Sequence, residues 1–162
     1  MTRNILLAVD AMQYAPEATH MARELCQCSG DRVVVLHVHE FAIGRFGRLQ
    51  VDCPEGDAER LVAGIRTEFV EAGIDAEAEI REAHVGQIAR TIIEAADEHD
   101  ARIIVLGSAT STDLPHIPFG SVSLRVLHLA KRSVMVVPRH AVGATEPAAV
   151  IRGHVAVEPV AG

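Results

Sequence analysis

The sequence contains no tryptophan, and aromatic residues make up 3% of its 162 residues. Valine, isoleucine, leucine and alanine must therefore fill the hydrophobic core. The sequence also has no run of Lys or Arg, and its formal net charge is −7. A surface for DNA or RNA needs clustered positive charge or aromatic side chains that stack on bases, so we expect no nucleic-acid partner.

Long apolar runs are missing as well. The first run, residues 4–9, ends at Asp10, and no other stretch has the length of a membrane span. We therefore expect a cytoplasmic protein without a membrane segment. The three cysteines, Cys26, Cys28 and Cys53, do not have the spacing of a zinc or redox motif. We interpret them as free thiols and predict no metal site; the alternative is that Cys26 and Cys28 hold a metal together with a histidine.

The pattern that is present is an alternation of short apolar runs with segments of helical periodicity. We expect strands at residues 4–9, 33–38, 76–81, 103–106 and 134–137, and helices at residues 16–28, 57–73 and 85–99 and from residue 120. This order predicts an α/β fold with a single open, doubly wound, parallel five-stranded sheet and helices on both faces. No period persists in residues 39–56, where Gly44, Gly47 and Pro54 indicate a long loop of the kind that often covers a site.

The length suits one domain, which we place at residues 1–140. Residues 141–162 differ from the rest because they are rich in Ala, Val, Gly and Pro. We predict a C-terminal tail there, either a mobile end or an arm, in which residues 149–157 could form an extra strand.

A possible ligand site follows the strand at residues 103–106. Gly107 ends this strand, and Gly120 and Ser121 precede a segment with helical spacing. The first amides of a helix lack internal partners and carry the positive end of its dipole, and glycine lets a phosphate approach the backbone. The stretch therefore has the order of a phosphate-binding loop, although most loops with two glycines are simply turns.

Three segments together resemble the universal stress protein family over residues 2–138: residues 5–10, residues 85–99, and residues 103–108 leading to Gly120-Ser121-Val122. In nucleotide-binding members, the motif reads Gly, two residues, Gly, nine residues, Gly, then Ser or Thr. This sequence keeps that length with Gly107, Gly120 and Ser121, but Thr110 stands at the second glycine.

The resemblance implies the strand order 3-2-1-4-5, with a ligand crevice between strands 1 and 4. It implies ATP or a related adenine nucleotide as the ligand, either alone or together with Mg²⁺. Asp10 would lie near the ribose or adenine and the Val38 backbone near adenine, and the other contacts would come from Gly107, Ser108 and Thr110 beside the phosphates and from Gly120, Ser121 and Val122 at the phosphate end. The structural alternatives are that Asp10 caps a turn, Val38 belongs to the core and Ser121 is a helix N-cap.

The loop between Gly107 and Gly120 differs from the family pattern in its charge. Asp113 adds a negative charge, and there is no Lys or Arg between Gly107 and Gly120. A triphosphate would therefore meet little compensating charge, whereas the hydroxyl groups of the loop suit a less charged ligand. Pro115 and Pro118 stiffen the same loop.

We expect no enzymatic activity, because the sequence has no Ser/His/Asp or Cys/His arrangement at a nucleophile turn and no Walker lysine. The leading hypothesis is a stress-response signalling or regulatory module that responds to nucleotide occupancy. The alternatives are an interaction protein of the same fold without nucleotide and, less favoured, a weak ATP hydrolase. We also expect a homodimer through the strand at residues 134–137, since an exposed strand edge is a liability. A regulatory protein is a second candidate partner.

Overall fold

The computed structural model describes residues 2–108 and 120–139. Strands and helices alternate along this part of the chain, as the sequence predicted. The elements are β1 (Asn4–Ala8), α1 (Pro16–Ser29), β2 (Arg32–Gly44), β3 (Gly47–Gln50), α2 (Asp57–Glu71), β4 (Ala76–His84), α3 (Ile88–Glu98), β5 (Ala101–Gly107), α4 (Ser121–Leu129) and β6 (Ser133–Val137).

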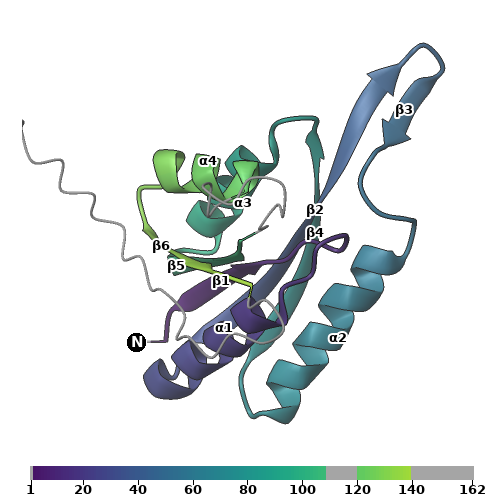
Figure 1. Ribbon diagram of the computed structural model, residues 1–162. Helices are drawn as coiled ribbons and strands as arrows, with labels where there is room; N and C mark the ends of the chain where they lie inside the picture. The colour runs from purple at the N-terminus through teal and green to yellow at the C-terminus, as the bar shows by residue number, and fades with distance from the viewer. Residues whose placement is uncertain (1, 109–119, 140–162) are drawn as a thin grey trace, which may run out of the picture.

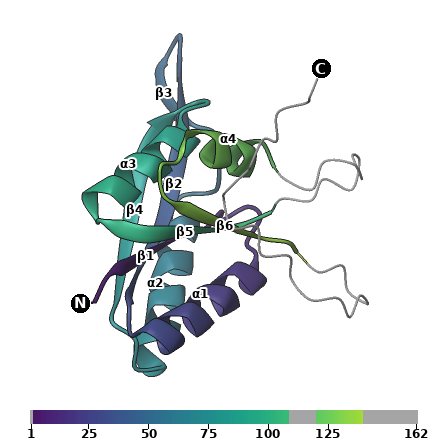
Figure 2. The same cartoon turned by 90° about the vertical axis from the view of Figure 1, so that its left-hand side faces the viewer.

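The centre of the molecule is a parallel sheet in which β1 lies between β2 and β5. β4 pairs with the other side of β2 and β6 pairs with β5, both in parallel. The five predicted strands therefore have the neighbours that we expected, and the α/β class is confirmed. Helices cover both faces of the sheet, with α1 and α2 on one face and α3 and α4 on the other (Figures 1 and 2).

The alternation of side chains along the strands creates two hydrophobic cores. Ile5 and Leu7 of β1 face α1 and α2, where the fully buried Phe69 belongs to the same cluster. Leu6 between them points to the opposite face and packs with residues of α3 and α4. Because both faces are covered, the central strands read as unbroken apolar runs, which is why the sequence located them.

The prediction of a loop at residues 39–56 is wrong in its first part. β2 continues to Gly44 and turns into β3, which pairs with it in antiparallel fashion from Phe41↔Gln50 to Gly44↔Gly47. The sheet thus has a sixth strand. The hairpin extends beyond the body of the molecule (Figures 1 and 2), and all four β3 residues are exposed. An exposed strand has no apolar face, so hydrophobic periodicity could not reveal it.

Backbone hydrogen bonds show on which side of β2 the new strand lies. The Leu36 carbonyl accepts from Val9 and the Glu40 carbonyl accepts from Val51, so the even-numbered residues of β2 face both β1 and β3. The odd-numbered residues face β4, as the bond from Val33 to the Asp75 carbonyl shows. β3 therefore follows β1 along the same edge of β2, beyond the carboxyl end of β1.

Thr110 and the predicted tail at residues 141–162 lie outside the described residues. None of the helices in the described part of the chain has the length and apolar character that a membrane crossing requires.

Candidate functional site

A cavity of about 390 Å³ opens at the carboxyl ends of β1 and β5. This is the position at which the strand order reverses, and open α/β sheets bind ligands at such a point. The volume lies within the range of about 300–1,000 Å³ that is usual for small-molecule sites. Of the residues predicted to contact a ligand, Asp10, Val38, Gly107, Gly120, Ser121 and Val122 line this crevice.

Asp10 follows β1 and has a structural role in addition to its place in the crevice. Its Oδ1 accepts hydrogen bonds from the backbone N–H groups of Met12 (2.8 Å) and Gln13 (3.3 Å). These bonds form a turn that leads the chain to α1. The alternative that Asp10 caps a turn is therefore observed, and the residue remains exposed to the crevice.

Gly107 ends β5 at the crevice, and the reason for glycine here is packing. A Cβ atom at this position would lie 2.5 Å from the Cβ of Ala15, at the start of α1. Ser108 is 2% exposed, and it is not one of the residues that line the crevice. Its Oγ is buried without a hydrogen-bond partner among residues 2–108 and 120–139.

The start of α4 forms the opposite wall. Gly120 is the N-cap residue, and no side chain of residues 2–108 or 120–139 makes a capping hydrogen bond there. Ser121 is the first residue of the helix and not its N-cap. Ser123 donates from Oγ to the Gly107 carbonyl (3.2 Å), which ties the first turn of α4 to the end of β5. The first turn of α4 therefore lies on the wall of the crevice, and no side chain in the described part of the chain caps it, an arrangement that favours an anion.

Val38 occupies a gap in the sheet. Its side chain is 5% exposed and belongs to the core, as the structural alternative stated. As an even-numbered residue of β2, however, it turns its backbone towards the edge shared by β1 and β3. The pairing with β1 ends at Ala8↔Leu36, and β3 begins with the bond from Val51 to Glu40. The Val38 backbone therefore faces the space between the two strands.

The charged residues of the crevice are all acidic. Asp10, Glu40 and Asp52 line it, and among the described lining residues there is no Lys or Arg. Residues 109–119, which connect β5 to α4, contain no Lys or Arg either. The charge imbalance expected from the loop sequence thus extends to the walls of the cavity.

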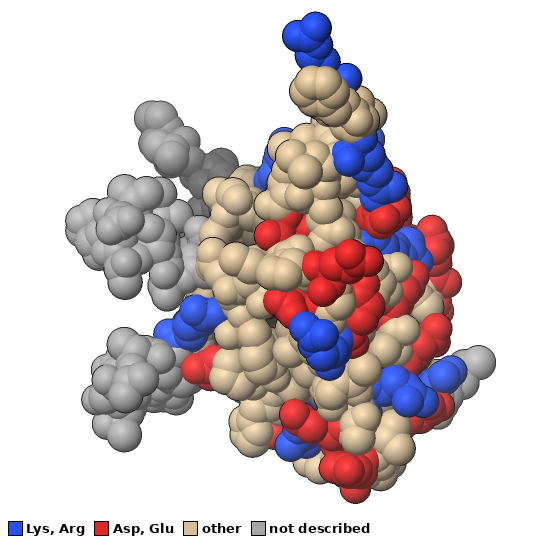
Figure 3. Space-filling view, turned by 90° about the vertical axis from the view of Figure 1, so that its right-hand side faces the viewer, with Lys and Arg blue, Asp and Glu red and all other residues tan. Residues whose placement is uncertain are grey.

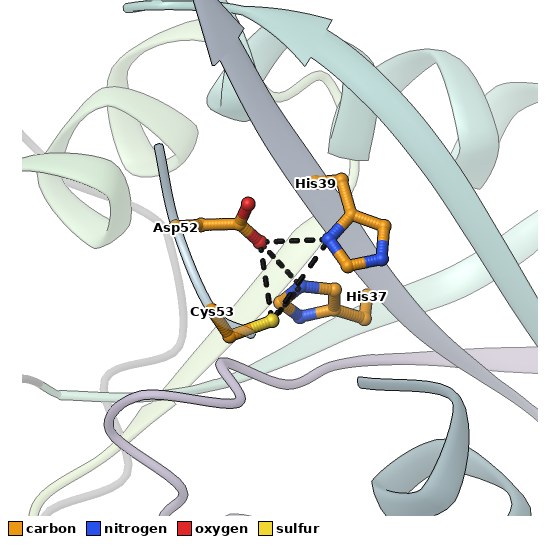
Figure 4. A group of neighbouring side chains, drawn as sticks. All are labelled: His37, His39, Asp52 and Cys53. Atoms are coloured by element: carbon orange, nitrogen blue, oxygen red, sulfur yellow. Dashed lines mark hydrogen bonds and ion pairs between the residues drawn. The ribbon is translucent and has the colours of Figure 1, made fainter. Parts of the chain in front are cut away.

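A second group of polar side chains lies behind the crevice wall. His37 and His39 project from one face of β2, and Asp52 and Cys53 reach them from the segment that follows β3 (Figure 4). The Asp52 Oδ2 atom is 3.1 Å from His37 Nε2 and 2.8 Å from His39 Nδ1. The Cys53 Sγ atom is 3.9 Å from each of these nitrogens and 3.4 Å from Asp52 Oδ2. Both histidines and Cys53 are buried.

The electrostatics of this group do not favour a nucleophilic cysteine. Burial and the neighbouring Asp52 raise the pKa of Cys53 to about 11, so that the thiol is protonated at neutral pH. Burial would also raise the pKa of Asp52, but hydrogen bonds with His39 and His37 hold it well below its usual range. Burial opposes the charge on His39, yet contacts with Asp52 and Glu59 raise its pKa.

The strand predicted at residues 33–38 includes His37, but sequence reasoning did not connect this residue to Asp52 and Cys53. The available signal was the spacing of His37 and His39, since residues two apart in a strand share a face. The other two residues could be placed only once the hairpin was known to return the chain to β2.

The sequence model of the universal stress protein family matches residues 1–138 of this chain. A sequence comparison with curated proteins found no match. Among solved structures, a universal stress protein from Archaeoglobus fulgidus has 23% identity and a TM-score of 0.66, covering 84% of this chain and 98% of that one. A structure of the universal stress protein from the same organism in complex with dAMP has 24% identity and a TM-score of 0.60, covering 83% and 96% of the two chains.

A universal stress protein in complex with cAMP has 16% identity and a TM-score of 0.60, covering 86% of this chain and 98% of that one. At these identities the solved structures show a common fold, and the family model identifies the group. The chain belongs to the universal stress protein family.

Proposed function

We propose that this universal stress family protein binds an adenine nucleotide in the crevice between β1 and β5 and acts as a regulatory module in a stress response. The observation that carries the proposal is the cavity of about 390 Å³, which brings Asp10, Val38 and the start of α4 together from three separate parts of the sequence. Relatives of the same fold that are described as complexes with dAMP and cAMP support the ligand class.

The two ends of the crevice suit the two ends of such a ligand. The Val38 backbone and the apolar Ile88 and Ile92 of α3 provide a surface and hydrogen-bonding groups for a purine. The first turn of α4, which no described side chain caps, provides amides for a phosphate. Asp10 lies on the wall of the same cavity, where its carboxylate can accept a hydrogen bond from a ribose hydroxyl.

The acidic residues on the walls of the crevice affect how many phosphates the bound nucleotide is expected to carry. Each additional phosphate adds negative charge to a crevice that already contains Asp10, Glu40 and Asp52. A nucleotide with one phosphate is therefore favoured over ATP, which requires Mg²⁺ to offset its charge in this crevice.

Gly120 offers a sharp test, because its φ of −67° and ψ of 162° are open to any residue. Gly120→Asp places a carboxylate at the N-cap, where it accepts from the first-turn amides and stabilises α4. The same carboxylate competes with a phosphate for those amides, so AMP affinity should fall at least about tenfold while adenosine affinity changes little. Gly120→Ala is the control for the added Cβ and should bind AMP almost as the wild type does.

Isothermal titration with AMP, adenosine and ATP with Mg²⁺ provides the affinities, and mass spectrometry of small molecules released on denaturation identifies any nucleotide retained from the cell. Equal AMP affinity of wild type and Gly120→Asp would place the ligand elsewhere. No nucleotide binding by the wild type would overturn the proposal.

A second candidate, an interaction protein, is favoured by the β2–β3 hairpin. Phe46 at its turn is 99% exposed, Ile43 is 72% exposed and Leu49 is 64% exposed. Isolated apolar side chains are common on surfaces, but three on one projecting hairpin are typical of a contact with another protein. Retention of a regulatory protein partner by the wild type and its loss in Phe46→Ser, with nucleotide absent throughout, would favour this function over the first.

We further propose that the protein is cytoplasmic, forms a homodimer through β6 and does not turn ATP over. The three cysteines are free thiols, which agrees with a reducing compartment. The raised pKa of Cys53 and its distance from both histidines argue against an activated nucleophile, and so against turnover of ATP. An ATP turnover that crevice variants abolish would contradict it.

A further inference from the structure

We propose that His37, His39, Asp52 and Cys53 form a four-coordinate Zn²⁺ site that fastens the segment after β3 to β2. Each residue offers one ligand atom to a common centre, and these four atoms lie within 4.8 Å of one another. Imidazole nitrogen, carboxylate oxygen and cysteine sulfur are the ligands of zinc sites in proteins. The mixture of thiolate and imidazole favours Zn²⁺ over Mg²⁺ or Ca²⁺, which prefer oxygen.

The spacing of the ligand atoms is close to that of a tetrahedron. With zinc bonds of about 2.0–2.3 Å, two nitrogen or oxygen ligands lie roughly 3.4 Å apart and a sulfur lies roughly 3.6 Å from either. The distances from Asp52 Oδ2 to the two histidine nitrogens are 3.1 and 2.8 Å, and Cys53 Sγ lies 3.4–3.9 Å from the other three atoms. The sixth pair, the two histidine nitrogens, lies within 4.8 Å, and zinc would draw these nitrogens to the tetrahedral separation.

The outer nitrogens of both imidazoles are held as zinc-binding histidines require. His37 Nδ1 donates to the Val9 carbonyl (2.9 Å), and His39 Nε2 lies 3.3 Å from Glu59 Oε1. In zinc sites such partners fix the ring orientation and the tautomer, so that the other nitrogen can bind the metal. His37 Nε2 lies 3.1 Å from Asp52 Oδ2, so a cation placed between them would contact both ligand atoms.

The two carboxylate oxygens of Asp52 have different surroundings. Its Oδ1 is buried and has no hydrogen-bond partner in the described part of the chain. Its Oδ2 receives the thiol hydrogen of Cys53 at 3.4 Å. When zinc binds, the thiol loses this proton to solvent and the thiolate sulfur takes its place as a ligand.

A route from solvent reaches the site. His39 and Cys53 lie on the wall of a second cavity, of about 770 Å³, which is also lined by three acidic residues, Glu55, Glu59 and Glu82, and by one basic residue, Arg81. The surface over α2 and β4 carries many acidic side chains, as Figure 3 shows. Negative charge at the entrance raises the local concentration of cations. Because all four positions belong to the protein, the site is closed and its role is structural rather than catalytic.

The test uses the full chain without an affinity tag, since a histidine tag binds zinc itself. Equilibrium competition with a chromophoric chelator should show one tight Zn²⁺ site per chain and no tight Mg²⁺ site. Cys53→Ser and His39→Gln should weaken the zinc affinity by about 100-fold or more, since loss of outer-shell partners alone costs 10–100-fold. The matched controls are Cys28→Ser and His84→Ala, which change exposed residues outside the cluster and should bind zinc as the wild type does.

Two further measurements separate loss of a ligand from loss of the fold. With Co²⁺, the wild type should show the visible bands of tetrahedral coordination and a thiolate charge-transfer band that Cys53→Ser lacks. Metal-free Cys53→Ser should keep the circular dichroism of the metal-free wild type, and zinc should raise the melting temperature only where Cys53 is present. Absence of a tight site in the wild type, or equal zinc affinity in Cys53→Ser, would overturn the proposal.

Discussion

Gly107 and Ala15 pack so closely that a methyl group on Gly107 would lie 2.5 Å from the Ala15 Cβ. The contact joins the end of β5 to the start of α1, and both residues line the crevice. A close approach of backbone to backbone thus brings two walls of the site together.

We expect Gly107→Ala to lower the free energy of unfolding by about 1–3 kcal/mol, because neither partner has a flexible side chain that could move aside. Ala15→Gly in the same chain removes the methyl group that would be struck. Ala15 is the N-cap residue of α1, where glycine is tolerated better than alanine, so the double variant should recover most of the loss. Urea unfolding of the two single variants and the double variant measures the coupling, and additive effects would contradict direct contact.

The sequence predicted the parts of the fold in which burial leaves a pattern. Val33, Leu36 and the run from Ile103 to Leu106 are apolar because helices cover both faces of their strands, and this located the crevice before its walls were known. The outer half of β2 and all of β3 lack such a pattern. Gly44 and Gly47 were interpreted as loop residues, whereas they face each other across a hairpin.

The same limit applies to the side chains of the candidate sites. Asp10 and Gly120 follow strand and loop boundaries and could be assigned from them. Asp52 and Cys53 come next to His37 only because the hairpin folds back on the side of β1. The packing role of Gly107 was not predictable either, since it depends on where α1 starts in space.

Asp31 leads to a prediction on acid stability. Its side chain, 6% exposed, forms an ion pair with Arg102 and accepts hydrogen bonds from the Arg3 amide (3.0 Å) and Ser29 Oγ (2.7 Å). Burial alone would raise the pKa of Asp31, but the hydrogen bonds from Ser29, Arg3 and Arg102 outweigh it and lower the pKa. The stabilisation is therefore present above the unfolded pKa of about 3.9 and is lost as the pH falls below it.

We expect Asp31→Asn to lower the free energy of unfolding at pH 7 by about 1.5–3 kcal/mol, the usual range for hydrogen bonds to a charged group. The difference from the wild type should shrink as the pH falls below about 4 towards the lowered pKa of Asp31, since the wild type loses the same interaction there. Urea unfolding at several pH values measures both curves. Parallel curves across this range would show that Asp31 titrates normally in the folded protein.

The edge of β6 allows a test of the proposed homodimer. Ser108 donates its backbone N–H to the Val137 carbonyl (2.8 Å), so the odd-numbered residues of β6 face β5. Val136 faces the other edge, with which no strand of the described residues pairs. Val136→Pro removes an outward N–H without removing a bond to β5. We expect the dimer dissociation constant to rise at least about tenfold, as light scattering over a concentration series would show.

Val136→Ala is the matched control, because it also reduces the volume of a buried side chain but keeps the N–H. It should lower stability while leaving the dimer affinity nearly unchanged. A monomeric wild type at micromolar concentration, or equal dissociation constants for the two variants, would exclude pairing through this edge.

The last prediction concerns the common wall of the two proposed sites. His37 and Asp52 line the crevice and also belong to the zinc cluster. Zinc would neutralise the negative charge of Asp52, which is one of the three carboxylates on the wall of the crevice. It would also hold the segment after β3 in place. Both effects favour the nucleotide, so we expect zinc to tighten AMP binding by about tenfold, or about 1.4 kcal/mol. By linkage, AMP must tighten zinc binding by the same factor.

Two sets of titrations measure these factors: AMP titrated with one equivalent of zinc present and after zinc is removed, and zinc titrated with and without AMP. Cys53→Ser should bind AMP as the metal-free wild type does and show no response to zinc. Equal AMP affinities with and without zinc, in a wild type that binds both, would show that the wall does not couple the two sites.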